Sequence, residues 1–319
     1  MIKIHRYNAQ LEKLWDDFVL KTKSPTLLHQ RTYMDYHANR FKDASLLLTD
    51  EHNRIISLLP ACWSNKQTDS IISHEGLTYG GYLFAPQTHT NLMEEAIERS
   101  LQFYKEELKV NSLILKPIPY IYNTQANDEQ LYIIHRLGGQ IQERNLSQAI
   151  NLAMPMKWSE LRRRSLLKAH KNALHIAKSE DREEWNRFHR LLSQMLSEHH
   201  NTRPVHSAEE LWMLHTRFPD SIQLYTAHKE RQLLAGAIIY LSPTVAHTQY
   251  LATSSEGRQC GALDFVISRV LTQESIQRRR WFDFGISTER DGSLNHGLTL
   301  QKEGFGGRGV CYDTYKITL

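Results

Sequence analysis

The sequence predicts a protein of mixed α/β (α+β) class with two tandem domains, each a mixed, mostly antiparallel twisted sheet flanked by helices. Three observations lead to this prediction. The length of 319 residues suits two domains of about 100–200 residues each. Segments of alternating or continuous apolar residues, which indicate strands, separate segments with helical spacing. The order of these segments in the first half of the chain recurs in the second half.

In the first half, apolar and polar residues alternate over residues 1–6 and indicate a strand. Apolar residues then recur at helical spacing over about 8–21, and Ser24-Pro25-Thr26 ends that helix. The further elements expected are a helix through Tyr33, Tyr36 and Phe41, strands ASLLLTD and IISLLPACW, strands over 70–74 and 78–84, a helix over about 91–109, strand SLILKPIPY, a short helix ending at Gly138-Gly139, and strand QIQERNLSQAINL.

The pattern restarts around residues 154–157, and a basic helix is expected over about 158–173. The elements expected after it are strand LHIAKS, helices over about 181–199 and 207–217, strands SIQLYTA, QLLAGAIIYL and VAHTQYLATS, a helix over about 262–277, strand RWFDFGIS, a short helix before Phe305, and strand GVCYDTYKI.

A double glycine marks the same position in both halves. Leu137-Gly138-Gly139-Gln140 corresponds to Phe305-Gly306-Gly307-Arg308, and each pair closes a helix and opens the final strand of its half. Glycine is favoured just after a helix because it adopts a left-handed backbone without steric cost. The repeat predicts domains at residues 1–153 and 154–319.

The charge balance excludes some classes of function. With 39 basic and 35 acidic residues the net charge is only +4, which is too small a surplus to indicate a nucleic-acid-coating protein. It is compatible with an anionic ligand held in one local basic patch. The residues Arg162-Arg163-Arg164 and Arg278-Arg279-Arg280 are the two basic runs.

Cysteine and histidine usage favours a reducing compartment without a metal site. Cys62, Cys260 and Cys311 are far apart and form no C-x-x-C pair, which argues against a disulfide framework or a zinc ribbon. No H-E-x-x-H motif occurs, so no metal is expected. The N-terminal residues lack an apolar signal segment, and no run reaches the ~18 apolar residues of a membrane span. We therefore expect a cytoplasmic protein with no integral membrane segment.

Three passages of the second half resemble those of a known family. They are LRRRSLLKAHKNALHIAKS, YLATSSEGRQCGALDFVISRVL and WFDFGISTERDGSLNHGLTLQKEGFGG. The first resembles a basic helix that leads into a strand, the second an acyl-donor strand, turn and helix, and the third a D-F-G-x-S…G-L…K-x-x-F-G segment. These are features of the FemAB family of cell-envelope aminoacyl and acyl transferases. The resemblance implies two tandem GNAT-like domains, with the active site in the C-terminal domain.

The resemblance also implies where the acyl donor binds. In the GNAT fold the donor carbonyl lies between two splayed strands, and the phosphates lie at the N-terminus of the next helix, where unpaired N–H groups favour an anion. Arg258 and Gly261 match the phosphate loop Q/R-x-x-G-x-G/A, whereas Leu263 departs from it. Thr253 and Ala262 complete the predicted donor-binding set. The implied co-substrate is acyl coenzyme A, with aminoacyl-tRNA as the alternative.

Two residues are the predicted catalytic groups. Lys302 matches the lysine of K-x-x-F-G, which the resemblance assigns to stabilising the negative charge of the tetrahedral intermediate, a role that suits a buried ammonium. Asp283 follows as a group that orients the amine or acts as a base. The alternative for Asp283 is structural, as a helix cap or an arginine partner.

Four further residues are candidates for binding the acceptor. Ser287, Asn295 and His296 follow the D-F-G segment, and His296 has a side chain that can act as a base near neutral pH. Tyr82 lies beside Gly80-Gly81 in the first half and either lines the cleft or packs in the core.

Three functions remain open at this point. The first is transfer of an acyl group from a thioester to an amino group of a cell-envelope or polysaccharide precursor. The second is an aminoacyl-tRNA-dependent FemAB-type peptidyltransferase that acts on a peptidoglycan precursor and needs a basic face for the tRNA. The third is a non-catalytic member that binds a nucleotide sugar or a partner protein, which the departures at Leu263 and Gln301 favour.

Overall fold

The chain folds into two compact units in a computed structural model that describes residues 2–200 and 202–319. The first unit comprises Met1–Leu146 and Cys311–Leu319, and the second comprises Ser147–Val310. The division therefore falls inside strand β8 (Gln140–Asn151), and the last strand, β14 (Arg308–Thr318), ends in the first unit. The boundary expected from the sequence, between residues 153 and 154, lies just after β8.

The first unit has two groups of paired strands. Strands β1-β2-β3-β6 form an antiparallel sheet, and β4, β5, β7 and β14 pair in that order, with β5 and β7 parallel. Its helices and strands are β1 (Lys3–Arg6), α1 (Glu12–Val19), α2 (Arg31–Met34), β2 (Leu46–Thr49), β3 (Ile55–Leu59), β4 (Cys62–Trp63), β5 (Ser70–Ile72), β6 (Leu83–Phe84), α3 (Thr90–Glu106), β7 (Ser112–Leu115) and α4 (Glu129–Arg136), with 3-10 turns at Ala9–Leu11, Leu27–His29, Asp35–Arg40 and Tyr120–Tyr122.

Two predicted elements of this unit are shorter than expected. The helix through Phe41 is only the short α2, followed by a 3-10 turn in which His37 has non-helical angles. The strand expected over 78–84 is reduced to Leu83–Phe84. Gly81 explains the second difference, because its φ of +87° is incompatible with an extended strand.

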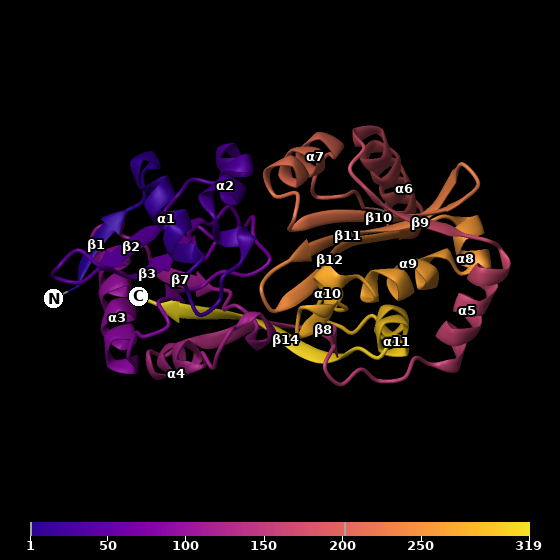
Figure 1. Cartoon of the computed structure of the whole chain (residues 1–319). Coiled ribbons are helices and arrows are strands. Elements are labelled where there is room, and N and C mark those ends of the chain that lie inside the picture. The colour runs from indigo at the N-terminus through magenta and orange to yellow at the C-terminus, as the bar shows by residue number, and fades with distance from the viewer. Residues whose placement is uncertain (1, 201) are drawn as a thin grey trace. The chain divides into compact units, whose positions relative to one another are not determined.

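The second unit is a single sheet with helices on both faces. Its strand order is β8-β13-β12-β11-β10-β9, and every pair is antiparallel except β12 with β13. Figure 1 shows α6 and α7 over one face of this sheet and α9 over the other. The elements are α5 (Glu160–Lys171), β9 (His175–Ser179), α6 (Arg182–His200), α7 (Ala208–Arg217), β10 (Ile222–Lys229), β11 (Gln232–Leu241), β12 (Val245–Thr253), α8 (Ser255–Cys260), α9 (Ala262–Leu271), α10 (Glu274–Gln277), β13 (Trp281–Ile286) and α11 (His296–Gly304).

One predicted helix of this unit is divided into two. The helix expected over 262–277 is α9 followed by α10, and α8 precedes them. Ser254 caps α8 by accepting a hydrogen bond from the backbone N–H of Gly257 at 2.9 Å. Gly261, with φ +79°, then separates α8 from α9.

Strands β12 and β13 pair over only a short stretch. Their register joins Val245 to Trp281, Ala246 to Phe282 and His247 to Asp283, and it goes no further. Strand β12 continues to Thr253 and β13 to Ile286, so the two strands diverge beyond His247 and Asp283. A bulge between β12 and β11, where the register shifts next to Ile239, adds to the bend of β12. The divergence leaves an opening in the sheet of the second unit.

The double glycines end a helix in the same way in both units. The Gly138 N–H donates to the His135 carbonyl and the Gly139 N–H to the Ile134 carbonyl, at 3.1 and 2.9 Å. In the second unit the N–H groups of Gly306 and Gly307 donate to Glu303 and Lys302 in the same pattern, at 2.9 and 3.1 Å. This is the Schellman ending of a helix, and both first glycines have positive φ. Lys302 therefore has Ile134 as its counterpart in the first unit.

The close packing of α5 against the turn between α8 and α9 generates a prediction about stability. A Cβ on Gly261 would lie 2.2 Å from the Ser165 backbone oxygen, whereas a Cβ on Gly292, which has a similar φ of +82°, would meet nothing within 4 Å. Gly292→Ala should cost about 1–2 kcal/mol for its left-handed backbone. Gly261→Ala should cost a further ~1–3 kcal/mol, because α5 must move. Urea unfolding measures both, and equal losses would contradict the packing described.

Candidate active site

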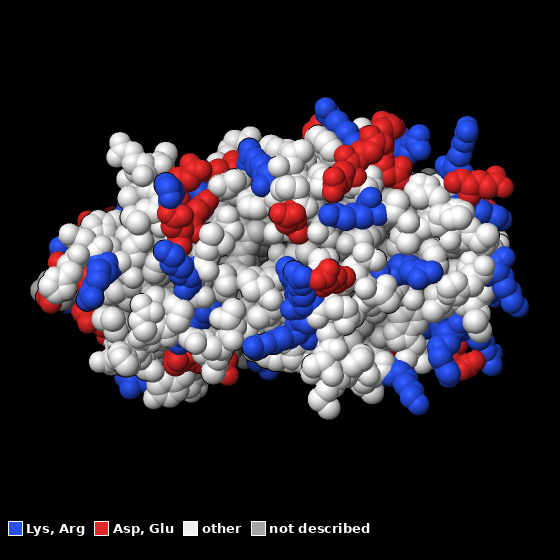
Figure 2. Space-filling model, in the orientation of Figure 1, with Lys and Arg blue, Asp and Glu red and all other residues white. Residues whose placement is uncertain are grey.

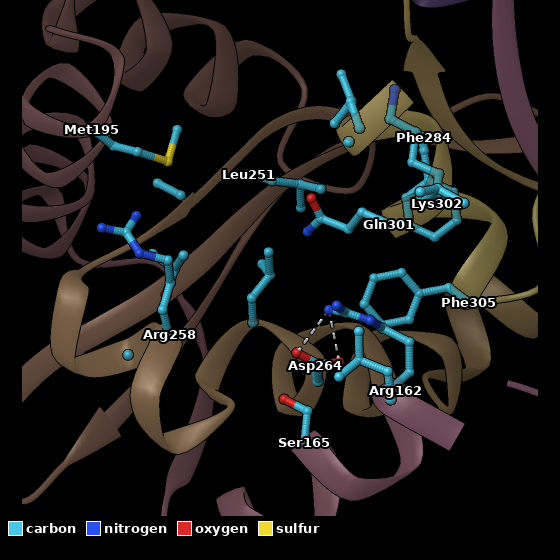
Figure 3. Close-up of a pocket in the computed structure, with 18 of the residues that line it drawn as sticks. Arg162, Ser165, Met195, Leu251, Arg258, Asp264, Phe284, Gln301, Lys302 and Phe305 are labelled. Carbon is cyan, nitrogen blue, oxygen red and sulfur yellow. Dashed lines mark hydrogen bonds and ion pairs between the residues drawn. The ribbon is translucent and has the colours of Figure 1, made fainter. Parts of the chain in front are cut away.

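A pocket of about 890 Å³ lies in the second unit beside the opening between β12 and β13. This volume is within the range of small-molecule sites. Leu251, Ala252 and Thr253 of β12 form one side of the pocket, and Phe284 of β13 with α11 forms another. The remaining lining comes from α5, α6, α8 and α9, as Figure 3 shows in part. The opening in the sheet is thus a boundary of the pocket.

Helix α5 presents one face to the pocket. Leu161, Arg164, Ser165 and Lys168 all line it, and their spacing of three and four residues puts them on one side of a helix. The helix begins where the Ser159 side chain accepts a hydrogen bond from the Arg162 N–H. Figure 2 shows lysine and arginine side chains gathered over the region of α5. The basic sequence of this helix therefore contributes positive charge to the pocket.

The charged groups of the pocket are mostly cationic. Arg162 pairs with Asp264 at 3.1 Å, and burial raises the pKa of that carboxyl group while Arg162 opposes the shift. Arg164 pairs with Glu160 at 2.9 Å. Among the described residues, Lys168 and Arg258 have no carboxylate partner. The surplus of positive charge suits an anionic ligand.

Lys302 lies at the side of the pocket farthest from Arg258 in Figure 3. The residue is 4% exposed, and its ammonium donates to the carbonyl oxygens of Gly285 and Ile286, both at 2.7 Å. An ammonium has three N–H groups, so one is left for a ligand. Burial lowers the pKa of Lys302 to about 8, and the negative charge of Asp283 acts in the opposite direction. The group is therefore still mainly charged at neutral pH.

Gly285 makes this contact geometry accessible. Successive carbonyls of an extended strand point in opposite directions, yet those of Gly285 and Ile286 both accept from one ammonium. The φ of Gly285 is +76°, a left-handed conformation that turns the end of β13. The glycine of the D-F-G triplet is thus explained by the backbone that Lys302 requires.

Asp283 is the centre of a buried hydrogen-bond network. It is fully buried, and its Oδ1 accepts from the Ser147 hydroxyl at 2.5 Å and from the Gly285 N–H at 3.2 Å. Its Oδ2 accepts from Nδ1 of His247 at 2.8 Å. With no exposed surface, Asp283 has no room to contact an acceptor amine directly. Its position supports a role in orienting other groups.

His247 and Ser147 were missed by the sequence analysis. They come from β12 and β8, and nothing in their local sequence distinguishes them from other strand residues. His247 follows from the strand register, because it lies opposite Asp283. In β8 the register puts Ala149 opposite Asp283 and Ser147 opposite Ile286, so Ser147 reaches Asp283 beside the irregularity in that pairing. A correct alignment of β12 with β13 was the only signal that would have found His247.

The predicted donor-binding residues divide into two pairs. Thr253 and Arg258 line the pocket. Gly261 and Ala262 do not; Gly261 packs against the Ser165 backbone, and Ala262 is part of the core under the sheet. Leu263, which departs from the phosphate-loop pattern, lines the pocket.

The four predicted acceptor-binding residues do not line the pocket. Ser287 is buried and donates to Gln148 at 2.5 Å. Asn295 caps α11 by accepting from the Leu298 N–H at 2.8 Å, and His296 is exposed at the start of that helix. Tyr82 is in the core of the first unit, where its hydroxyl bonds to Ser100 and burial raises its pKa. The structure places these side chains in capping, packing or surface positions.

Within residues 2–200 and 202–319, no three His, Cys, Asp or Glu side chains come together in a way that would hold a metal ion. None of the helices in the same ranges combines the length and the apolar character that crossing a bilayer requires.

Comparison with known proteins identifies the fold. Residues 158–291 match the family model described as an acetyltransferase (GNAT) domain. The structure of FemX is similar over 99% of this chain and 97% of that chain, with a TM-score of 0.69 and 11% identity. L-PGS from Bacillus licheniformis matches over 98% and 92%, with a TM-score of 0.61 and 9% identity. These matches confirm the predicted fold class.

A third solved structure has the tandem arrangement in its description. It is a tandem GNAT protein from the clavulanic acid biosynthesis pathway, which matches over 100% of this chain and 98% of that chain at a TM-score of 0.52 and 10% identity. No curated protein sequence matches the chain. The fold of the chain and a GNAT acetyltransferase domain over residues 158–291 are therefore as predicted.

The burial of Lys302 predicts a pH dependence of stability. In the unfolded chain this lysine keeps its proton up to its ordinary pKa of 10.5, whereas the folded protein releases it above about 8. Below about pH 8 the folded protein bears the full free-energy cost of burying the charged ammonium. Between the two pKa values the unfolded chain binds more protons than the folded protein, so the free energy of unfolding rises with pH. Relative to Lys302→Gln, the wild type should gain on the order of 2 kcal/mol between about pH 8 and 10. Urea unfolding of both proteins tests this, and a constant difference would contradict the shifted pKa.

Proposed function

We propose that this chain, whose second unit carries a GNAT acetyltransferase domain in a fold shared with FemX, transfers an acyl group from a thioester donor such as acyl coenzyme A to an amino group. The observation that carries the proposal is the position of the Lys302 ammonium. It is buried beside the divergence of β12 and β13 and lines a pocket that also contains unpaired cations. A ligand there meets positive charge in two separate regions of the pocket.

The groups that line the pocket can be matched to the successive parts of such a donor. Coenzyme A thioesters are anionic at the nucleotide end, largely neutral along the pantetheine arm, and electrophilic at the acyl carbonyl. Lys168 and Arg258 are the groups we assign to the phosphates, because they are exposed, line the pocket and have no carboxylate partner among the described residues. Leu251 and Leu263 supply apolar surface for the arm. The carbonyl then lies in the opening, near Lys302.

Lys302 is the group we assign to the developing oxyanion. Attack of the amine on the carbonyl carbon moves an electron pair onto the carbonyl oxygen, and collapse of this intermediate breaks the C–S bond and releases the thiol. A donor aimed at the oxyanion in a site that excludes water contributes about 3–4 kcal/mol to the barrier. The two backbone carbonyls that hold the ammonium fix its position before the substrate arrives.

The acceptor class is proposed from the family resemblance. The segment from Trp281 to Gly307 resembles that of FemAB-type enzymes, so the acceptor we propose is an amino group of a cell-envelope or polysaccharide precursor. Aminoacyl-tRNA is the alternative donor, because its ester carbonyl poses the same chemical problem. The large pocket beside the opening favours a donor with a long arm over a bare tRNA end.

Ligand-dependent stabilisation tests the donor. Acetyl coenzyme A should raise the Tm of the wild type according to RT ln(1 + [L]/Kd), and charged tRNA should not. Lys168→Ala should weaken the affinity about tenfold, the worth of one charged hydrogen bond. Lys171→Ala is the matched control, because this exposed lysine lies one turn further along α5 and does not line the pocket.

The outcomes separate the alternatives. Stabilisation by charged tRNA alone would replace coenzyme A as the donor. No response to either ligand would contradict the transferase proposal. Release of thiol from acetyl coenzyme A on addition of primary amines would then demonstrate transfer itself.

A further inference from the structure

We propose that His247 is the base that accepts the proton of the attacking amine, and that Asp283 holds it in the required tautomer; this inference rests on the proposed acyl transfer. Nδ1 of His247 donates to the buried Asp283 carboxylate at 2.8 Å. An imidazole with its proton on Nδ1 has a bare Nε2. Among the described residues Nε2 has no hydrogen-bond partner, so it is available to a ligand.

The Asp283 carboxylate is itself fixed in place. The Ser147 hydroxyl and the Gly285 N–H both donate to its Oδ1, which leaves Oδ2 for the imidazole. Three donors on a fully buried carboxylate stabilise its charged form. A charged Asp283 then favours the imidazolium that forms when Nε2 takes a proton, which is the logic by which a buried aspartate supports a catalytic histidine.

His247 also lies at the opening in the sheet. His247 and Asp283 are the last paired residues of β12 and β13. A Cβ placed on Gly285 would lie 3.3 Å from Cε1 and 3.9 Å from Nε2 of His247, and the carbonyl of the same Gly285 accepts from Lys302. The imidazole and the ammonium therefore flank one residue. Both are placed to act on a carbonyl group held there.

The two groups approach that position from different faces of the sheet. Ala246, Phe282 and Phe284 belong to the core with α9, and Phe284 lines the pocket. Because side chains alternate along a strand, His247 and Asp283 project from the opposite face, which α6 and α7 cover (Figure 1). His247 does not line the pocket assigned to the donor, so we assign the amine to the side of His247 and the donor to the pocket. The side chain of His247 is 14% exposed, so this side is not sealed.

The proposed acyl transfer needs no reactant besides the thioester and the amine. The neutral amine nitrogen bonds to the carbonyl carbon, and an N–H proton passes from it to Nε2 of His247. The C–S bond then breaks, the thiolate departs with the electron pair, and the imidazolium returns the proton to the thiolate. The products are an amide and a free thiol. His247 ends the cycle neutral, as it began.

Other charged groups near His247 do not replace it as the base. Asp283 is fully buried and already accepts three hydrogen bonds. Lys302 is the group that donates to the oxyanion, and two of its N–H groups are used by backbone carbonyls. His296 lies outside the pocket on the exposed start of α11. His247 is the titratable group in this region that combines a fixed tautomer with an open nitrogen.

The test is steady-state kinetics with acetyl coenzyme A and a panel of primary amines that includes glucosamine, lysine and glycinamide. His247→Gln should lower kcat by about 10²–10⁴, the usual contribution of a general base. The KM for acetyl coenzyme A should stay within about twofold, because His247 does not line the pocket assigned to the donor. Added imidazole should restore part of kcat to His247→Ala. His175→Gln, at an exposed histidine on β9, is the control that should keep wild-type kinetics.

Each possible result of these kinetic measurements either supports or overturns the role of His247 as the base. A His247→Gln enzyme with kcat within about threefold of the wild type would overturn the role of His247 and leave the proposed transferase intact. Loss of kcat that imidazole does not rescue would assign His247 a structural role and also overturn the proposal. A wild type that releases no thiol with any amine would overturn the proposed function, and the base role with it. Independently of folding in the variants, ¹⁵N-histidine spectra of the wild type should show His247 with its proton on Nδ1; a proton on Nε2 would contradict the proposal.

Discussion

The bond between the Lys302 ammonium and two consecutive carbonyls of β13 is the interaction on which the site depends. It holds α11 to the end of β13 and requires the left-handed Gly285. Burying a charged lysine is costly unless polar groups surround it, and these carbonyls provide that compensation at a point where β12 and β13 no longer pair. The same geometry leaves one ammonium proton directed to a ligand. The same ammonium thus joins α11 to β13 and keeps one N–H group available to a ligand.

The two units show how one scaffold has been specialised. Both end a helix with a double glycine and the same pair of backbone hydrogen bonds. At the equivalent position the first unit has Ile134, a fully buried core residue, and the second has Lys302. An apolar side chain at this position contributes packing alone. The buried charge of a lysine there requires hydrogen bonds to carbonyl oxygens. The second unit therefore differs from the first at this position by a buried charge, to which we assign the proposed catalytic role.

Local sequence could predict those parts of the site that depend on residues close together in the chain. Double glycines, helical spacing and the K-x-x-F-G segment are short-range patterns, and they correctly predicted the order of elements and the burial of Lys302 in a pocket. Arg258 and Thr253 were likewise placed in the pocket because they follow directly from the β12-to-α8 turn. The contacts that local sequence does not reveal depend on long-range pairing. His247 meets Asp283 only through the parallel register of two strands, and Ser287 is buried because Gln148 of β8 lies beside it. The boundary within β8 depends on where the final strand pairs, which no local pattern records.

The central claim is that Lys302 donates to the carbonyl oxygen of a thioester held where β12 and β13 diverge. A crystal structure of the protein with a ketone analogue of acetyl coenzyme A, in which a methylene replaces the sulfur, tests this most directly. The ketone oxygen should lie within about 3.2 Å of Nζ of Lys302, the limit of an ordinary hydrogen bond, with the diphosphate near Lys168 and Arg258. An analogue bound with its ketone away from the opening, and Lys302 still occupied only by Gly285 and Ile286, would contradict the claim.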